Sequence, residues 1–254
     1  MEYTLITGAT AGIGKALAYE CAKKGMNLLL IARREERLED ISSDLIKKYA
    51  IKAHYIKADL KKAQTPDDIY NHIKEKKYDI STLILNAGYQ HNKKLEEISI
   101  QDEEDCIRVL GLSIIMQSKL FLNDFKKRGG GKIMVVSSVA AFAPPSTEFA
   151  LLYGPIKTFM NRFVEALNGG YNKYNIYASA LCPGYTITEF HSKSGTQDRM
   201  DKVPTFMKLS AERVAKEGIK GLLNKKEIII PGKIYKLIIL LLKCVPKPII
   251  KGLG

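Results

Sequence analysis

A tyrosine and a lysine stand four residues apart in the stretch YGPIK, at Tyr153 and Lys157. On a helix, positions i and i+4 lie on one face, one turn apart. A free phenol has a pKa of about 10, and lowering it by about three units takes roughly 4 kcal/mol. An ammonium group about 4 Å away supplies about that much at an effective dielectric of about 20. The pair could therefore act as an acid–base unit, although an isolated Tyr-x-x-x-Lys is more often an ordinary aromatic beside a surface lysine.

A glycine-rich turn follows the first apolar run, in the segment TGATAGIG with Gly8, Gly12 and Gly14. It stands between a predicted strand and a predicted helix, where glycines let the backbone approach a pyrophosphate. The helix N-terminus then offers free N–H groups and a partial positive charge. We therefore predict a dinucleotide site in this turn, in preference to a glycine turn without a ligand.

Apolar runs rich in Val, Ile and Leu alternate with helix-like segments and provide the frame for these residues. The runs are YTLIT, MNLLLIAR, IKAHYIKADL, ISTLILNAG, GKIMVVSS, NIYASALCPG and KEIIIPG. Strands that alternate with helices predict a parallel sheet covered on both faces. We predict an α/β fold with a doubly wound parallel sheet of about seven strands. Because no Pro/Ser-rich linker interrupts the chain, we expect a single domain over residues 1–254.

Five motifs in register resemble the short-chain dehydrogenase/reductase family. TGATAGIG has the spacing of that family's cofactor turn, and LNAG at 85–88 resembles its Asn-Ala-Gly motif after the fourth strand. VVSS, YGPIK and CPGYTITEF are similar to its later signatures and follow in the same order. The resemblance extends to about IIIPG. It implies a Rossmann-like fold that binds a nicotinamide cofactor and interconverts a carbonyl and a secondary alcohol.

The end of the second predicted strand bears on the choice of cofactor. An acidic residue there accepts hydrogen bonds from a ribose 2′-hydroxyl and repels a 2′-phosphate. This chain has Ala32, Arg33 and Arg34 instead. Because guanidinium groups match phosphate geometry with paired donors, we predict NADP(H), with Arg33 as the favoured contact. For Arg34 two interpretations stay open, a phosphate contact and a solvated first helical turn.

The resemblance implies further cofactor contacts along the chain. Asp59 resembles the first residue of an adenine-contacting Asp-Leu pair, Asn86 lies where the cofactor passes the fourth strand, and Thr188 matches a threonine that reaches the carboxamide. With Arg33 and Arg34, the expected cofactor-binding residues are Gly8, Thr10, Gly12, Ile13, Gly14, Asp59, Leu60, Asn86, Ala87, Gly88, Tyr153, Lys157, Pro183, Gly184, Thr186 and Thr188.

The resemblance also assigns catalytic roles. Tyr153 would give a proton to the substrate carbonyl as hydride arrives, and Lys157 would lower the pKa of that phenol and bind the nicotinamide ribose. Ser138 ends a predicted strand, at the edge where open α/β sheets bind ligands, and would hydrogen-bond the carbonyl. Ser137 competes for that role, and simple strand-end hydrogen bonding is the alternative for both serines. The expected catalytic set is Ser138, Tyr153 and Lys157.

Two departures from the family pattern have structural consequences. Pro155 stands where the family usually has alanine, and proline is tolerated only in the first turn of a helix. The helix that carries the pair should therefore begin close to Tyr153. Leu110 appears at the position where many members have an asparagine that holds a proton-relay water. This leaves open a rerouted relay, reduced activity, or cofactor binding with little turnover.

The C-terminal third predicts a substrate region and a hydrophobic end. Residues 190–210 have the composition of a substrate-covering flap, in which Phe190, Phe206 and Met207 either line an apolar pocket or pack ordinarily. The basic, apolar segment 232–254 contains a run of about a dozen apolar residues, about 18 Å as a helix and too short for a hydrocarbon core of about 30 Å. We favour a cover for the pocket or a subunit interface over contact with an anionic membrane surface, and a partly exposed hydrophobic end is the last alternative.

Composition narrows the function classes. The formal charge is +13, but the lysines are spread along the chain, so we expect no nucleic-acid partner. The four cysteines and four histidines show no ligand spacing, which predicts no metal and a reducing compartment. The chain begins with MEYTLITG, which reads as a strand rather than as a signal peptide, and we expect a cytoplasmic protein.

The prediction from sequence is an NADP(H)-dependent oxidoreductase, forming a homodimer or homotetramer and acting on a hydrophobic carbonyl compound such as a ketoacyl or steroid-like substrate. The alternative is an NADP(H)-binding redox sensor or membrane-associated regulator with little catalysis, which Leu110 favours.

Overall fold

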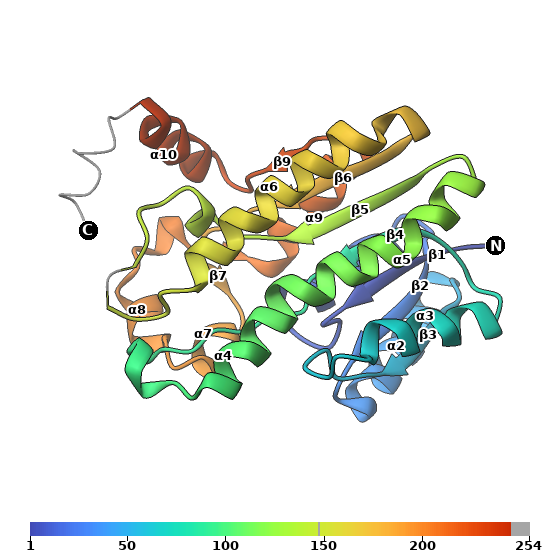
Figure 1. Cartoon of the computed structure of the whole chain (residues 1–254), viewed down its shortest axis with the longest axis horizontal. Helices are drawn as coiled ribbons and strands as arrows, with labels where there is room; N and C mark the ends of the chain where they lie inside the picture. Colours follow the sequence, from blue (N-terminus) through green and yellow to red (C-terminus); the bar gives the residue numbers. More distant parts are fainter. Residues whose placement is uncertain (147, 245–254) are drawn as a thin grey trace.

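A sheet of parallel strands forms the centre of the protein (Figure 1). The computed structural model describes residues 1–146 and 148–244, and within them the main sheet has seven strands in the order β3-β2-β1-β4-β5-β6-β9. The strands are β1 (Glu2–Thr7), β2 (Asn27–Ala32), β3 (Ala53–Lys57), β4 (Asp79–Leu85), β5 (Gly131–Val136), β6 (Ile176–Leu181) and β9 (Ile228–Ile229). Each predicted apolar run overlaps one of these strands, so the predicted doubly wound α/β sheet is confirmed.

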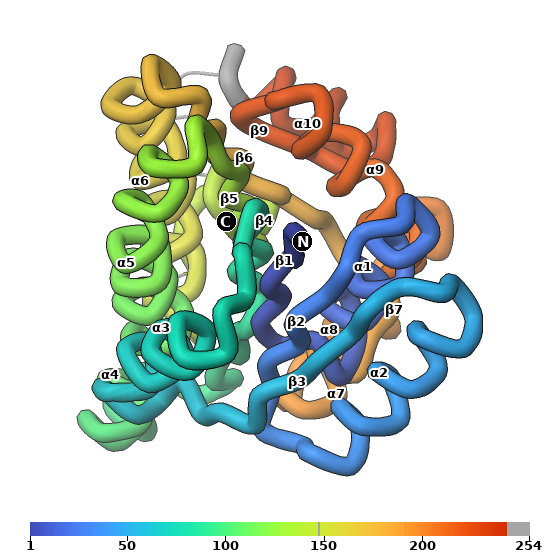
Figure 2. The backbone as a smooth tube through the Cα atoms, turned by 90° about the vertical axis from the view of Figure 1, so that its right-hand side faces the viewer, coloured from blue at the N-terminus to red at the C-terminus, as the bar shows by residue number. Residues whose placement is uncertain are grey.

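Helices cover both faces of the sheet, as Figure 2 shows. One layer contains α1 (Gly12–Ala22), α2 (Glu35–Tyr49) and α9 (Ala211–Leu223), and the other contains α3 (Thr65–Glu75), α5 (Ser113–Lys127) and α6 (Tyr153–Tyr171). Successive strand residues point to opposite faces, so Ile6 packs in the first core layer and Leu5 in the second. This burial on both sides explains why the strands are continuous apolar runs.

The chain crosses from one side of β1 to the other between β3 and β4, because β1 pairs in parallel with both β2 and β4. Ligands of open α/β sheets bind beyond the carboxyl ends of the strands at such a reversal of strand order. The turn after β1 and the segment after β4 both lie at this point. The topology therefore brings the glycine turn and the Asn-Ala-Gly motif together.

The long helical stretch after β4 is interrupted. It consists of α4 (Ile100–Ile107), a π-helical turn η2 (Arg108–Leu112) and α5. Leu110 lies buried within this turn. Single π turns inside helices are frequent at functional sites, and this one lies at the position where the sequence departs from the family pattern.

The helix α6 begins at Tyr153, with Leu152 as its N-cap. Pro155 is therefore in the first turn, where its missing N–H removes no helical hydrogen bond. The predicted start of this helix is confirmed.

Smaller elements complete the carboxyl edge and the end of the described chain. Figure 1 shows α4, α7 and α8 grouped beyond the ends of the strands. The remaining elements are η1 (Leu95–Glu97), η3 (Val139–Ala141), η4 (Asn172–Tyr174), β7 (Thr186–Ile187), α7 (Glu189–Lys193), α8 (Gln197–Lys202), η5 (Thr205–Met207), β8 (Leu209–Ser210) and α10 (Lys233–Cys244). Among the described helices, none combines the length and the apolar character needed to cross a bilayer. The last part of the predicted C-terminal segment, residues 245–254, lies outside the described residues.

Candidate active site

The glycine turn depends on its glycines for conformation and for space. Gly8 and Gly12 have φ of 67° and 51°, a region that side-chain-bearing residues rarely adopt. A Cβ on Gly14 would lie 2.2 Å from the Gly8 carbonyl oxygen, so only glycine fits where α1 meets the turn. The N-cap residue of α1, Ala11, makes no side-chain capping hydrogen bond. This tight turn before an uncapped helix fits the pyrophosphate of a dinucleotide.

Asn86 holds the turn in place from the neighbouring strand end. Its Nδ2 donates to the carbonyl oxygens of Thr7 (3.0 Å) and Gly8 (3.3 Å). The buried Thr7 hydroxyl accepts from the backbone N–H groups of Asn86 and Ala87 at 2.9 and 3.1 Å. Sequence reasoning missed Thr7, although a threonine at the end of an Ile/Leu strand was a visible signal.

Thr188 and the short helix α7 lie against the same turn. The Thr188 Cβ is 3.1 Å from the position that a Cβ on Gly12 would take. Its hydroxyl accepts from the Phe190 N–H at 3.2 Å and caps α7. The chain after β6 therefore folds back onto the predicted cofactor turn, where Thr188 packs against Gly12.

Two arginines follow the end of β2, where a 2′-phosphate contact was predicted, and Arg34 is the one that touches the glycine turn. Arg34 donates from Nε and NH2 to the Thr10 hydroxyl at 3.3 and 3.1 Å, which places it on the glycine turn. Arg33 is exposed, and its charge acts on Tyr89. Glu189 forms ion pairs with Arg34 and with Arg37. Neither Arg37 nor Glu189 was selected from the sequence, since only the three-dimensional fold brings α7 to the start of α2.

The other expected cofactor residues are spread around this edge. Asp59 ends the third strand region and accepts from the Lys61 N–H at 3.1 Å. Pro183 accepts from the Val139 N–H at 3.0 Å and joins the ends of β5 and β6. Ile13 and Leu60 pack in the two core layers. Gly88 lies against Leu110, and Gly184 lies under the ring of Tyr235. The Thr186 hydroxyl donates to the Gly184 carbonyl oxygen.

The expected catalytic side chains meet at the carboxyl end of β5. Lys157 is buried; its Nζ donates to the Val136 carbonyl oxygen at 2.8 Å and lies 5.4 Å from the centre of the Tyr153 ring. Ser138 follows β5, accepts from the Ala140 N–H at 3.1 Å and is a hydrogen-bond partner of Tyr153. The Ser137 hydroxyl instead donates to the Lys157 carbonyl oxygen at 3.1 Å. Ser138 is thus the serine directed at Tyr153.

The electrostatics of this group differ from the expectation. Although the Tyr153 side chain as a whole is half-buried, burial around its hydroxyl raises its pKa to about 12, and the Ser138 hydrogen bond offsets only part of the rise. Burial lowers the pKa of Lys157 to about 8, against smaller opposite effects of Cys182 and Cys106. The expectation that Lys157 acidifies Tyr153 is wrong for this state of the protein. In each case burial, which disfavours the charged form, is the largest cause of the shift.

Apolar and thiol groups surround Tyr153 on the substrate side. The ring of Phe190 lies 6.2 Å from the Tyr153 ring, centre to centre. A small hollow beside them is lined by Gln90, His91, Ile98, Glu103, Cys106, Ala150, Leu152 and Tyr153. Of the other two flap candidates, Phe206 is largely exposed and Met207 packs against the core. Phe190 is thus the flap residue nearest the catalytic group.

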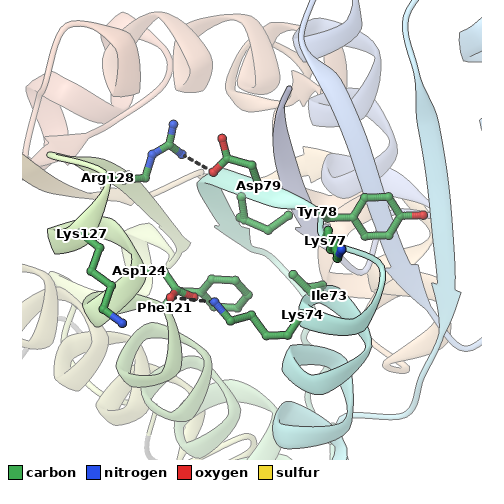
Figure 3. A pocket seen from close by; sticks show the side chains of 10 residues that line it. Ile73, Lys74, Lys77, Tyr78, Asp79, Phe121, Asp124, Lys127 and Arg128 are labelled. Carbon is green, nitrogen blue, oxygen red and sulfur yellow. Dashed lines mark hydrogen bonds and ion pairs between the residues drawn. The ribbon is translucent and has the colours of Figure 1, made fainter.

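A larger hollow of about 490 Å³ lies elsewhere (Figure 3). It is lined by residues at the amino end of β4 and the carboxyl-terminal ends of α3 and α5, among them Asp79, Lys74 and Arg128. Two ion pairs lie within it, Lys74–Asp124 at 2.8 Å and Arg128–Asp79 at 3.4 Å. Since the catalytic side chains lie at the opposite ends of the strands, we assign the chemistry to the smaller hollow. Over the described chain, no group of three or more His, Cys, Asp or Glu side chains could hold a metal ion.

Comparisons with known proteins agree with this geometry. Residues 2–199 match the family described as short chain dehydrogenase, so the chain belongs to that family, and it is an oxidoreductase whose fold binds a nicotinamide cofactor. It is 28% identical over 225 residues to the very-long-chain 3-oxoacyl-CoA reductase of Bos taurus, covering 86% of this chain and 68% of that protein.

Two further similarities extend the comparison. The human 17-beta-hydroxysteroid dehydrogenase type 3 is 33% identical over 196 residues, covering 76% of this chain and 61% of that protein. A short-chain dehydrogenase from Sphingobium yanoikuyae, solved in complex with NADPH, superimposes with a TM-score of 0.84 at 24% identity, covering 92% of this chain and 88% of that one. The structural match supports the fold, and the chain spans about two thirds of the length of the two relatives matched by sequence.

Proposed function

We propose that this protein reduces a hydrophobic carbonyl compound to a secondary alcohol with NADPH. The observation that carries the proposal is the meeting of Ser138, Tyr153 and Lys157 at the same sheet edge as the glycine turn. When bound, the nicotinamide cofactor supplies the hydride. The Tyr153 hydroxyl gives its proton to the carbonyl oxygen, while the Ser138 hydroxyl hydrogen-bonds that oxygen and orients it.

The protonation state of Tyr153 suits carbonyl reduction. Its pKa of about 12 keeps the phenol protonated at neutral pH, which is the acid form that carbonyl reduction consumes. Alcohol oxidation would instead use the phenolate as a base, so the protonated phenol suits the reductive step. Lys157 stands against the ring and restores charge balance when Tyr153 has given up its proton.

The substrate class is supported by the lining of the site and by the relatives. Phe190, Leu152 and Cys106 present apolar or weakly polar surface around Tyr153. The names of the two sequence relatives describe reductases or dehydrogenases of long acyl and steroid compounds. We therefore propose a 3-ketoacyl or steroid-like carbonyl as the substrate, and a cytoplasmic location in keeping with the free thiols of Cys21, Cys106 and Cys182.

The cofactor preference rests on Arg33 and Arg34. Both follow the end of β2, and Arg34 touches the glycine turn through Thr10. Two guanidinium groups at this point suit the 2′-phosphate of NADPH.

A turnover assay tests the proposal. The protein is mixed with NADPH or NADH and a panel of long-chain and steroid ketones, and cofactor oxidation is followed. We expect NADPH-dependent turnover that Tyr153→Phe abolishes and that Tyr171→Phe, at the far end of the same helix, leaves intact. Tight NADPH binding with no turnover on any ketone would instead support the sensor, for which buried Leu110 is the motivating feature.

A further inference from the structure

Glu189 is surrounded by three cations at the edge of the cofactor site. Its carboxylate oxygens lie 2.9 Å from Arg37 NH1, 3.3 Å from Arg34 NH1 and 2.8 Å from Lys193 Nζ. Lys193 and then Arg37 are the largest causes that lower the pKa of Glu189 to about 2. The carboxylate is therefore ionised throughout the pH range in which the protein would work.

The two arginines held by Glu189 belong to the segment where the 2′-phosphate is proposed to bind. Arg34 is the N-cap residue of α2 and reaches the Thr10 hydroxyl in the glycine turn with its Nε and NH2. Its NH1 is directed to Glu189, as is NH1 of Arg37 one helical turn on. A carboxylate thus takes the guanidinium donors that a phosphate would otherwise take.

We propose that Glu189 is a cofactor-specificity residue: its carboxylate competes with the 2′-phosphate of NADPH for Arg34 and Arg37, and so weakens NADPH binding without weakening NADH binding. This rests on the proposed function in so far as the phosphate must bind at these arginines. NADH carries no 2′-phosphate, so it leaves the ion pairs in place. NADPH must displace Glu189, which keeps its partner Lys193 on the same short helix.

The size of the effect follows from exposure. The side chains of Arg34, Arg37 and Glu189 are 37%, 47% and 42% exposed, and ion pairs of this kind are weak because water screens them. Two such pairs correspond to a change in the dissociation constant of about two- to tenfold. When the 2′-phosphate displaces Glu189, the ion pairs between α7 and the start of α2 are lost. Binding of NADPH should therefore make the segment that follows Thr188 more mobile.

The test compares Glu189→Gln with Glu165→Gln. Glu165 is paired with Arg162 on α6, so its variant removes one negative charge away from the arginine pair. Dissociation constants for NADPH, NADH, adenosine 2′-monophosphate and adenosine 5′-monophosphate are measured by fluorescence titration or calorimetry. We expect Glu189→Gln to bind NADPH and the 2′-phosphate probe about two to ten times more tightly, with NADH and the 5′-phosphate probe unchanged. Glu165→Gln should leave all four constants unchanged.

Unchanged or weaker NADPH binding in Glu189→Gln, or an equal change for both nicotinamide cofactors, would overturn the proposal. Arg34→Gln separates this failure from failure of the proposed cofactor. If Arg34→Gln weakens NADPH while Glu189→Gln does not strengthen it, only the competition is wrong. If neither variant changes NADPH binding, the phosphate does not bind at Arg34, and both the competition by Glu189 and the proposed phosphate contact of Arg34 are wrong.

A second measurement uses the unaltered protein. Hydrogen exchange of the backbone amides of 189–193 should be faster with saturating NADPH than with saturating NADH, because only the phosphate releases Glu189 from α2. Equal exchange with the two cofactors would contradict the competition even if Glu189→Gln failed to fold.

Discussion

Lys157 and Tyr153 respond to burial in opposite directions. The ammonium group loses hydration and its pKa falls to about 8, while the phenol is held protonated with a pKa of about 12. A lysine placed one turn from a tyrosine was expected to acidify it. Burial is the largest cause of both shifts, because each charged form loses water where the side chain is enclosed. The pair therefore suits proton donation, with the lysine as the group that titrates near neutral pH.

The first prediction concerns the pH dependence of carbonyl reduction. Because Lys157 has a folded pKa of about 8, its positive charge is present below that pH and is lost as pH rises through it. We expect kcat for ketone reduction to fall above about pH 8. Steady-state rates from pH 6 to 10 in buffers of constant ionic strength would measure the profile. A rate that stays level to pH 10 would show that the charge on Lys157 is not needed.

The second prediction concerns the stability cost of the same lysine. Its folded pKa is lower than the ordinary value of 10.5, so the folded protein binds fewer protons between about pH 8 and 10.5, and stability rises with pH through that window. At pH 7 the burial costs on the order of 3 kcal/mol. Lys157→Met removes that cost but also the hydrogen bond to Val136, so we expect a net gain of about 1–3 kcal/mol.

Urea unfolding of the wild type and Lys157→Met at pH 7 and pH 10 checks this. The difference between the two proteins should shrink at pH 10, where the lysine is already neutral in the folded state. A Met variant that is less stable at pH 7, or a gain that does not depend on pH, would contradict the burial argument.

At the scale of elements, the glycine turn gives the third prediction. A Cβ at Gly14 would lie 2.2 Å from the Gly8 carbonyl oxygen, whereas one at Gly170 in α6 meets no atom within 4 Å. Gly14→Ala should therefore displace the turn and weaken nicotinamide cofactor binding at least tenfold, about 1.4 kcal/mol. Gly170→Ala should bind normally and gain about 0.5–1 kcal/mol of stability from helix propensity. Cofactor titration and thermal unfolding of both variants measure this, and normal binding by Gly14→Ala would refute it.

The elements show which features a sequence exposes. The inner strands were predictable because burial on both faces requires continuous apolar runs. The start of α6 was predictable because Pro155 fits a first turn. The π turn at Arg108–Leu112 was not predictable, since one inserted residue leaves the helical hydrophobic pattern of the flanking segments almost unchanged. The raised pKa of Tyr153 was not predictable either, because burial around one hydroxyl depends on how α4, α6 and α7 pack.

At the scale of the whole molecule, the site is assembled from segments far apart in the chain. Glu189 bonds to Arg37 across 152 positions, and Asn86 bonds to Thr7 across 79. The second contact was within reach of prediction because two motifs at neighbouring strand ends must meet in a parallel sheet. The contact between Glu189 and Arg37 depends on the path of the irregular segment after β6, for which no periodic pattern exists.

The helix α10 carries apolar residues on two sides. On the inner side, the Tyr235 hydroxyl donates to the Met207 carbonyl at 2.8 Å and accepts from the Tyr185 N–H at 2.9 Å. It thereby ties the flap to the segment after Pro183. On the outer side, Leu237, Leu240 and Leu241 are 57%, 59% and 56% exposed.

The outer side of α10 gives the last prediction. Three leucines on one exposed helical face, at spacings of three and four residues, are typical of a helix that packs against another helix. We predict that this face joins two copies of the chain, and that the double variant Leu237→Glu, Leu241→Glu is a folded monomer in sedimentation experiments in which the wild type is a dimer or larger. Lys220→Glu, at an exposed position of α9, changes the net charge by the same amount and should leave the assembly intact. A monomeric wild type would contradict the prediction, and if that monomer bound phosphatidylserine vesicles through the same leucines, the face would serve a lipid surface instead.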